Sequence, residues 1–186
     1  MDSSSGFDRL LAEGAAASQA GKGEAALALY ARAAELNPGS PLPAFLVASE
    51  QASAGRFAEA ELSFAAALLM APDFALARYQ LGLLQFSSQR AAVALLTWQP
   101  LFALGEGDAL RHFVHGFAAL AQDAFAEALA HFRRGLHCKP ANPALCADIA
   151  QVVDAVERLH ERQPQAGDDA GAGAHVLLSA YSGGVH

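Results

Sequence analysis

The sequence repeats with a period of 34 residues. The repeated phrase is an alanine, then an aromatic residue, a small residue and a proline. Its four copies stand at Ala26, Tyr30, Ala33 and Pro38; Ala60, Phe64, Ala67 and Pro72; Ala94, Trp98, Leu101 and Glu106; and Ala128, Phe132, Gly135 and Pro140. The third copy departs from the pattern, but the register continues through it. A fixed period of this length is typical of a chain that stacks one small helical unit on the next.

A second position also repeats at this interval and holds a small residue in every copy. Its members are Gly14, Ala48, Gly82 and Gly116. We expect each unit to be two antiparallel helices, A and B, which approach closely at the small residues. The aromatic residue then fills space between one unit and the next, and the proline ends helix B. Hydrophobic residues make up 53% of the chain and β-branched residues are scarce, which favours an all-α fold over a sheet.

These residues at this spacing resemble the tetratricopeptide repeat (TPR) family. The resemblance implies an all-α, right-handed superhelical solenoid of four repeats over residues 7–40, 41–74, 75–108 and 109–142. Residues 143–163 are expected to form a capping helix, because apolar residues recur there at helical spacing. Residues 1–6 read as a flexible leader, and residues 164–186 as a flexible linker with an apolar tail.

The turn between helices A and B carries glycine in the first two units, at Gly21 and Gly55, as expected of helix C-caps. Gln89 replaces glycine in the third unit, where Pro100 also falls inside the expected helix B. We therefore expect that helix to be kinked and to end early.

Function in the TPR family depends on the concave groove lined by the A helices. The family's groove positions give a set that becomes steadily more apolar along the chain. The predicted groove residues are Leu42, Phe45, Leu76, Tyr79, Leu83, Phe86, Leu110, Phe113, Phe117 and Leu120. A contiguous apolar concavity favours binding of an apolar peptide or helix, although the same residues are also suited to packing in the core. The positions that hold a terminal carboxylate in TPR co-chaperones carry no cation here (Leu11, Ala15, Leu46, Leu76 and Gln80).

The expected function is a non-enzymatic adaptor or chaperone-like module. One alternative is a self-associating protein, such as a homo-dimer, whose groove holds its own or a neighbour's tail through Val176, Leu177, Leu178 and Tyr181. Another is a protein similar to the acidic TPR chaperones of bacterial type III secretion.

Charge and hydropathy exclude several partners. A formal net charge of −7 disfavours nucleic acid, and no uninterrupted apolar stretch is long enough to predict a membrane span. No signal peptide is visible, so we expect a cytoplasmic protein with Cys138 and Cys146 as free thiols.

The sequence contains no catalytic constellation, and we expect no cofactor and no metal. His112 and His115 are one helical turn apart and are the exception to weigh, because two histidines at this spacing can share a metal ion. A site needs a third ligand, and His115 lies beside the packing position Gly116, so packing is the favoured interpretation. Gly21–Lys22–Gly23 lacks the remainder of a phosphate-binding loop and reads as a turn.

Overall fold

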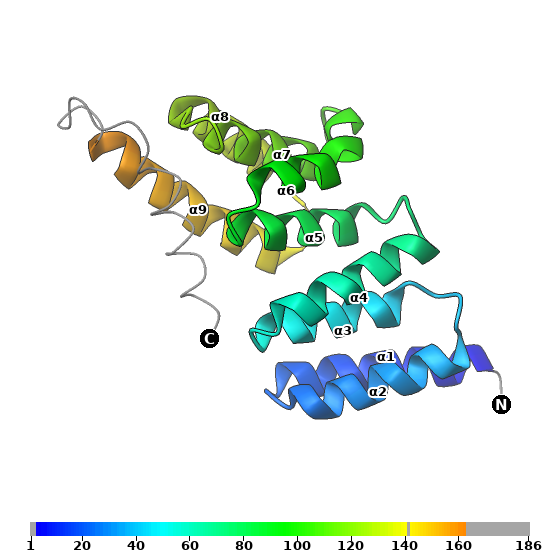
Figure 1. Cartoon of the computed structure of the whole chain (residues 1–186). Helices are drawn as coiled ribbons and strands as arrows, with labels where there is room; N and C mark the ends of the chain where they lie inside the picture. The colour runs from blue at the N-terminus through cyan, green and yellow to red at the C-terminus, as the bar shows by residue number, and fades with distance from the viewer. Residues whose placement is uncertain (1–2, 141, 163–186) are drawn as a thin grey trace. The chain divides into compact units, whose positions relative to one another are not determined.

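The computed structural model describes residues 3–140 and 142–162, and within them the chain is all helical, as predicted (Figure 1). The α-helices are α1 Ser3–Gln19, α2 Gly23–Leu36, α3 Leu42–Ser53, α4 Phe57–Met70, α5 Ala75–Ser87, α6 Ala91–Trp98, α7 Ala109–Leu120, α8 Phe125–His137 and α9 Pro143–Arg162. A short 3-10 helix, η1, covers Gln99–Ala103. Residues 163–186, which include the predicted linker and tail, lie outside the described residues.

The helices pack as sequential pairs, α1 with α2, α3 with α4 and α7 with α8. The chain divides into two compact units, Met1–Leu84 and Gln85–His186, called unit 1 and unit 2 below. In unit 1, α2 also packs on α3, and in unit 2, α8 packs on α9. The division into four 34-residue repeats remains a prediction.

Small residues set the spacing within a pair. In α7, Gly116 lies under the ring of Phe132 from α8, and a β-carbon on Gly116 would come within 2.5 Å of Phe132 Cε1. Gly14 and Tyr30 are related in the same way in α1 and α2. In these two pairs the aromatic residue therefore packs on the small residue of its own helix pair. The sequence analysis expected it to fill space between one 34-residue repeat and the next. Trp98 contacts an aromatic ring of α5 and one of α7, since its ring lies 5.9 Å from that of Phe86 and 5.5 Å from that of Phe117.

The turns inside the pairs share one backbone conformation. Gly21 and Gly55 have φ of 70° and 74°, and Gln89 and Asp123, each 34 residues further on, have φ of 62° and 55°. The left-handed region suits glycine but is strained for a residue with a β-carbon. The conformation is thus kept in every turn, while the glycine is kept in only two.

Three helix boundaries have a clear physical cause, and one of them differs from the expected position. Helix α1 already begins at Ser3, inside the expected flexible leader, because Phe7 and Leu10 are buried and hold its first turns against the core. The expected break near Pro100 occurs where α6 ends at Trp98 and η1 continues. Helix α7 then begins at a proper cap, since the Asp108 side chain accepts a hydrogen bond of 2.8 Å from the Leu110 backbone N–H.

Candidate interaction surfaces

The predicted groove residues are mostly buried. Six of the ten have side chains at or below 9% exposure: Tyr79, Leu83, Phe86, Phe113, Phe117 and Leu120. Phe45, Leu76 and Leu110 are half-buried, and Leu42 is exposed. A binding role for this set remains a prediction, and in the present conformation only the last four could offer area to a partner.

In unit 1, aromatic packing accounts for the partial burial of Phe45. The Phe45 ring from α3 lies 5.8 Å from Phe64 of α4 and 5.0 Å from Phe74, which directly precedes α5. These rings join a core that contains Ala48, Ala60 and Leu81. Phe45 is therefore an anchor of the α3–α4 pair as well as a predicted groove residue.

Unit 2 buries its predicted groove aromatics among its own helices. Phe86 lies 5.3 Å from Phe117, and Phe117 lies 5.0 Å from Phe132 of α8. Phe113 is fully buried against Gly135 of α8. These rings pack against one another and against α8, so they belong to the core of unit 2.

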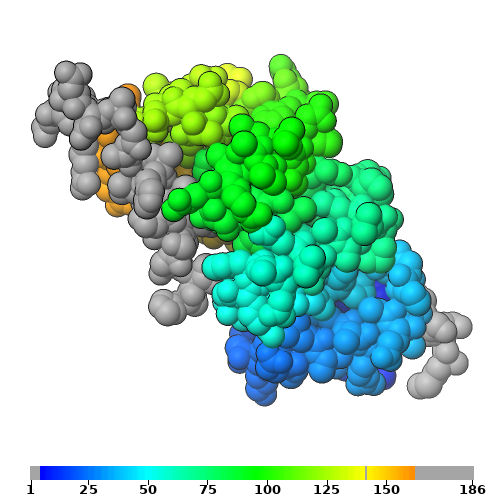
Figure 2. Space-filling model, in the orientation of Figure 1, coloured from blue at the N-terminus to red at the C-terminus, as the bar shows by residue number. Residues whose placement is uncertain are grey.

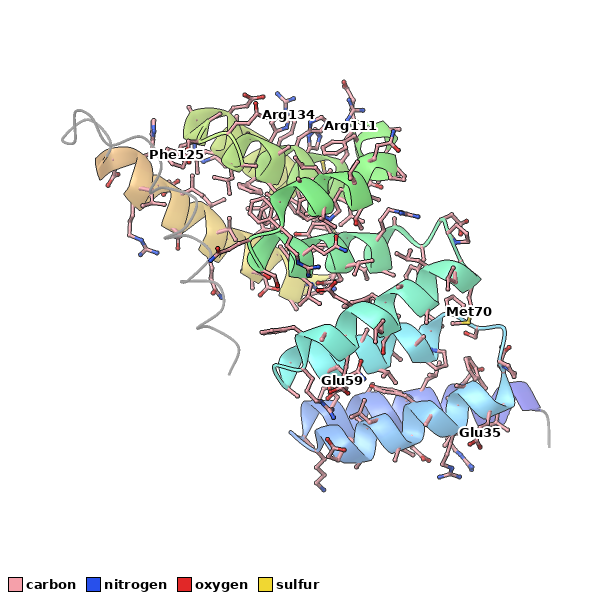
Figure 3. All side chains as sticks on the ribbon, in the orientation of Figure 1. Glu35, Glu59, Met70, Arg111, Phe125 and Arg134 are labelled. Carbon is pink, nitrogen blue, oxygen red and sulfur yellow. The ribbon has the colours of Figure 1, made fainter. Side chains whose placement is uncertain are left out.

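A different apolar surface is open on unit 1. Leu69 and Leu62 on α4 are 85% and 74% exposed, and Met70 is 40% exposed. Leu62, Ala66, Leu69 and Met70 recur at positions i, i+4, i+7 and i+8, so they lie along one face of the helix. We call this set the α4 stripe. In Figure 1, α2 and α4 lie in front of α1 and α3, and Figure 3 labels Met70 near the end of α4.

A cavity of about 260 Å³ adjoins the α4 stripe. Helices α2, α3 and α4 line it with small and apolar side chains, among them Ala31, Ala34, Val47, Ala66 and Met70. Figure 2 shows this face of unit 1, with the blue surface of α2 next to the cyan and teal surface of α4. The cavity is smaller than most small-molecule sites, which run from about 300 to 1,000 Å³. It is better suited to receive one or two side chains of a larger partner.

Sequence reasoning missed the α4 stripe because it followed the A helices. The available signal was composition: residues 57–70 carry only two charged residues, Glu59 and Glu61, and are apolar around the whole helix. A helix that is apolar all round either is buried on every side or leaves apolar area exposed. Helix α6, with Leu96 at 76% exposure, shows the same pattern in unit 2.

The histidines form a cluster on the α7–α8 pair. The rings of His115 and His131 stack at 5.0 Å, and His112 lies 6.0 Å from His131. Among the described residues, no group of three or more histidine, cysteine or acidic side chains is arranged to hold a metal ion. Cys138 and Cys146 are free thiols in this part of the chain. No described helix is both long enough and apolar enough to cross a membrane.

Comparison with known proteins gives matches to solved structures alone. No family model matches the sequence, and no curated protein matches it. A MamA RS-1 ArsTM double mutant superposes with a TM-score of 0.63 at 14% identity, over 95% of this chain and 94% of that one. MamA 41-end from Desulfovibrio magneticus RS-1 gives 0.62 at 15% identity, over 95% and 93%.

A third solved structure agrees with these two. A crystal structure of MamA matches with a TM-score of 0.58 at 19% identity, over 72% of this chain and 78% of that one. MamA is a TPR-repeat protein. At such low identity the likeness carries the fold and leaves the function to the residues. The chain therefore has the tetratricopeptide-repeat fold of MamA.

Proposed function

We propose that this chain is a non-enzymatic scaffold that binds an apolar segment of another protein on unit 1. The fold is consistent with a protein-interaction scaffold. The observation that carries the proposal is the α4 stripe, in which Leu69 and Leu62 remain 85% and 74% exposed beside an apolar cavity. Large apolar side chains gathered on one surface mark an interaction site in a water-soluble domain.

An apolar helix or extended segment fits this surface best. The stripe gives a row of aliphatic contacts, and the cavity gives a place for one inserted side chain. Apart from the Tyr30 hydroxyl, Ser40 and Ser63 are the polar side chains of the lining. A charged group entering the cavity would lose its hydration without gaining a charged partner, which is unfavourable. The half-buried members of the predicted groove are proposed as further contacts, Phe45 and Leu76 within unit 1 and, separately, Leu110 within unit 2. We also propose that the protein acts in the cytoplasm.

Affinity capture with three forms of the full-length chain tests this function. The double substitution Leu62→Glu with Leu69→Glu places two charges on the α4 stripe and replaces no buried residue. Leu96→Glu on α6 is the matched control, since Leu96 is 76% exposed and lies outside the stripe. We expect the wild-type and control chains to retain the same partner and the double variant to lose it, with unchanged helicity by circular dichroism.

Sizing by light scattering separates a foreign partner from self-association. If the wild-type chain is a dimer and the double variant a monomer, the surface binds a second copy of this chain, and the proposal of a foreign partner fails. If all three forms retain the same partner equally, the α4 stripe is the wrong surface.

A further inference from the structure

Three histidine rings lie together between α7 and α8, and two of them stack; the three are called the stack below. His115 of α7 and His131 of α8 lie 5.0 Å apart with an angle of 16° between their planes. His112, one helical turn before His115, lies 6.0 Å from His131 and is only 4% exposed. Phe102 of η1 packs edge-on against His115 at 4.9 Å. The stack is thus part of the contact that holds α7, α8 and η1 together.

The hydrogen bonds of the stack fit neutral rings. The His112 Nε2 lies 2.7 Å from the backbone carbonyl oxygen of Glu106, and since a carbonyl can only accept, Nε2 carries the proton. The Nδ1 atoms of His112 and His131 are both buried without a hydrogen-bond partner among the described residues. A neutral ring leaves an unprotonated nitrogen there. An imidazolium would place a buried N–H where no acceptor is available, which is costly.

Burial and most of the neighbouring charges also favour the neutral form of His115 and His131. Burial is the largest cause that lowers the pKa of His115, followed by Arg111 and His112, and burial also lowers the pKa of His131, followed by His115 and His112. Arg134 adds to the effect on His131, while Glu127 opposes it for both rings. Figure 3 labels Arg111 on α7 and Arg134 on α8.

The charged groups that act on His115 and His131 all belong to α7 and α8. η1 contributes the uncharged ring of Phe102, and the loop before α7 contributes a carbonyl from Glu106. On α9, which packs on α8, Glu157 is paired with Arg133 at 2.5 Å. Glu127 is therefore the one described carboxylate that favours protonation of both rings.

We propose that His115 and His131, packed beside His112, form a pH-sensitive contact that holds α7 on α8 while the two rings are neutral and weakens when they gain protons. Two imidazolium rings in the His115–His131 stack would repel each other at 5.0 Å. Protonation of His131 would also leave a buried N–H donor without an acceptor at its Nδ1 atom. The structure that responds is the α7–α8 pair, together with η1, which contacts His115 through Phe102.

The direction of the pH effect follows from proton linkage. An unfolded chain takes up protons on His115 and His131 near the ordinary pKa of about 6.5. The folded chain resists protonation to lower pH, so between the two values the unfolded state binds more protons, and the free energy of unfolding rises with pH. The stabilisation is fully present above about pH 6.5 and is lost as the pH falls through the lowered folded-state pKa values.

Urea unfolding of the full-length chain between pH 5 and pH 8, followed by Trp98 fluorescence, tests the proposal. Trp98 is the single tryptophan and is fully buried in unit 2. The unfolding equilibrium constant should rise as the pH falls, by at most about tenfold per pH unit for each excess proton on the unfolded chain. The double variant His115→Gln with His131→Gln should flatten this dependence. His137→Gln, an exposed position on α8, should leave it unchanged.

An equal pH dependence in the wild-type chain and the double variant would overturn the proposal. NMR titration of the imidazole signals of the wild-type chain provides a second readout that needs no variant to fold. The signals of His115 and His131 should titrate with a pKa below the ordinary value. If both titrate at the ordinary value, they do not form a pH-sensitive contact.

Discussion

The ring of Phe132 lies directly on Gly116, close enough that a β-carbon at Gly116 would come within 2.5 Å of Phe132 Cε1. Phe132 is itself fully buried and lies 5.0 Å from the Phe117 ring, so it has no free space into which to move. The distance between α7 and α8 is therefore set by a glycine and an aromatic residue 16 positions apart. Gly14 and Tyr30 have the same separation in α1 and α2.

Gly116→Ala should destabilise unit 2 by about 1–3 kcal/mol, the usual cost of overpacking a core. The added methyl group forces Phe132 or the α7 backbone to shift, and this outweighs the gain in helix propensity. Urea unfolding followed by Trp98 fluorescence measures the change. Gly105→Ala is the control, because a β-carbon at Gly105 meets no atom within 4 Å. Equal stability of the two variants would contradict the packing described here.

Gln89→Gly should stabilise the chain by about 1 kcal/mol, although it removes a side chain, because glycine relieves the strain of a left-handed backbone. Gln89 has φ of 62° in the turn between α5 and α6, where Gly21 and Gly55 hold the corresponding places in earlier turns. Ser88→Gly is the neighbouring control, and it should not stabilise, because the φ angle of Ser88 is not positive. Thermal unfolding of both variants distinguishes strain relief from a general effect of glycine in this turn.

Thr97→Val should destabilise unit 2 by about 1–3 kcal/mol, the cost of a buried acceptor that loses its donor. The Thr97 hydroxyl donates a hydrogen bond of 2.7 Å to Gln85 Oε1, and Gln85 is only 8% exposed. Ser63 donates to Gln51 Oε1 at the same distance, 34 residues earlier. Because Gln51 is less buried, Ser63→Ala should cost less. The reverse order of the two losses in urea unfolding would contradict this account.

Much of the fold could be predicted because the 34-residue period records packing. A small residue opposite an aromatic one is needed wherever two helices meet this closely, so Gly116 and Phe132 indicate a helix pair from their types and spacing alone. The hydrogen bond between Thr97 and Gln85 also follows the period. The sequence does not reveal it, because a polar residue inside a pair is equally consistent with a solvated face.

The proposed interaction surface was harder to predict, because an apolar side chain is equally suited to a core and to a binding groove. Tyr79 and Phe113 stand at family groove positions, yet both are fully buried. Burial depends on how each pair closes, and the one-dimensional pattern does not record it. The exposure of Leu62 and Leu69 likewise depends on which residues fill the buried face of α4, and these are Ala60, Phe64 and Ala67.

Site-specific photo-crosslinking examines whether a partner binds the α4 stripe, on which the proposed function depends. A photoreactive amino acid is placed at Leu69 in one chain and at Leu96 in another, two positions with 85% and 76% exposure. After capture of the partner and irradiation, we expect a covalent adduct with an apolar segment of the partner from position 69 and none from position 96. An adduct from position 96 alone would show that the partner binds elsewhere and that the α4 stripe is not the binding surface.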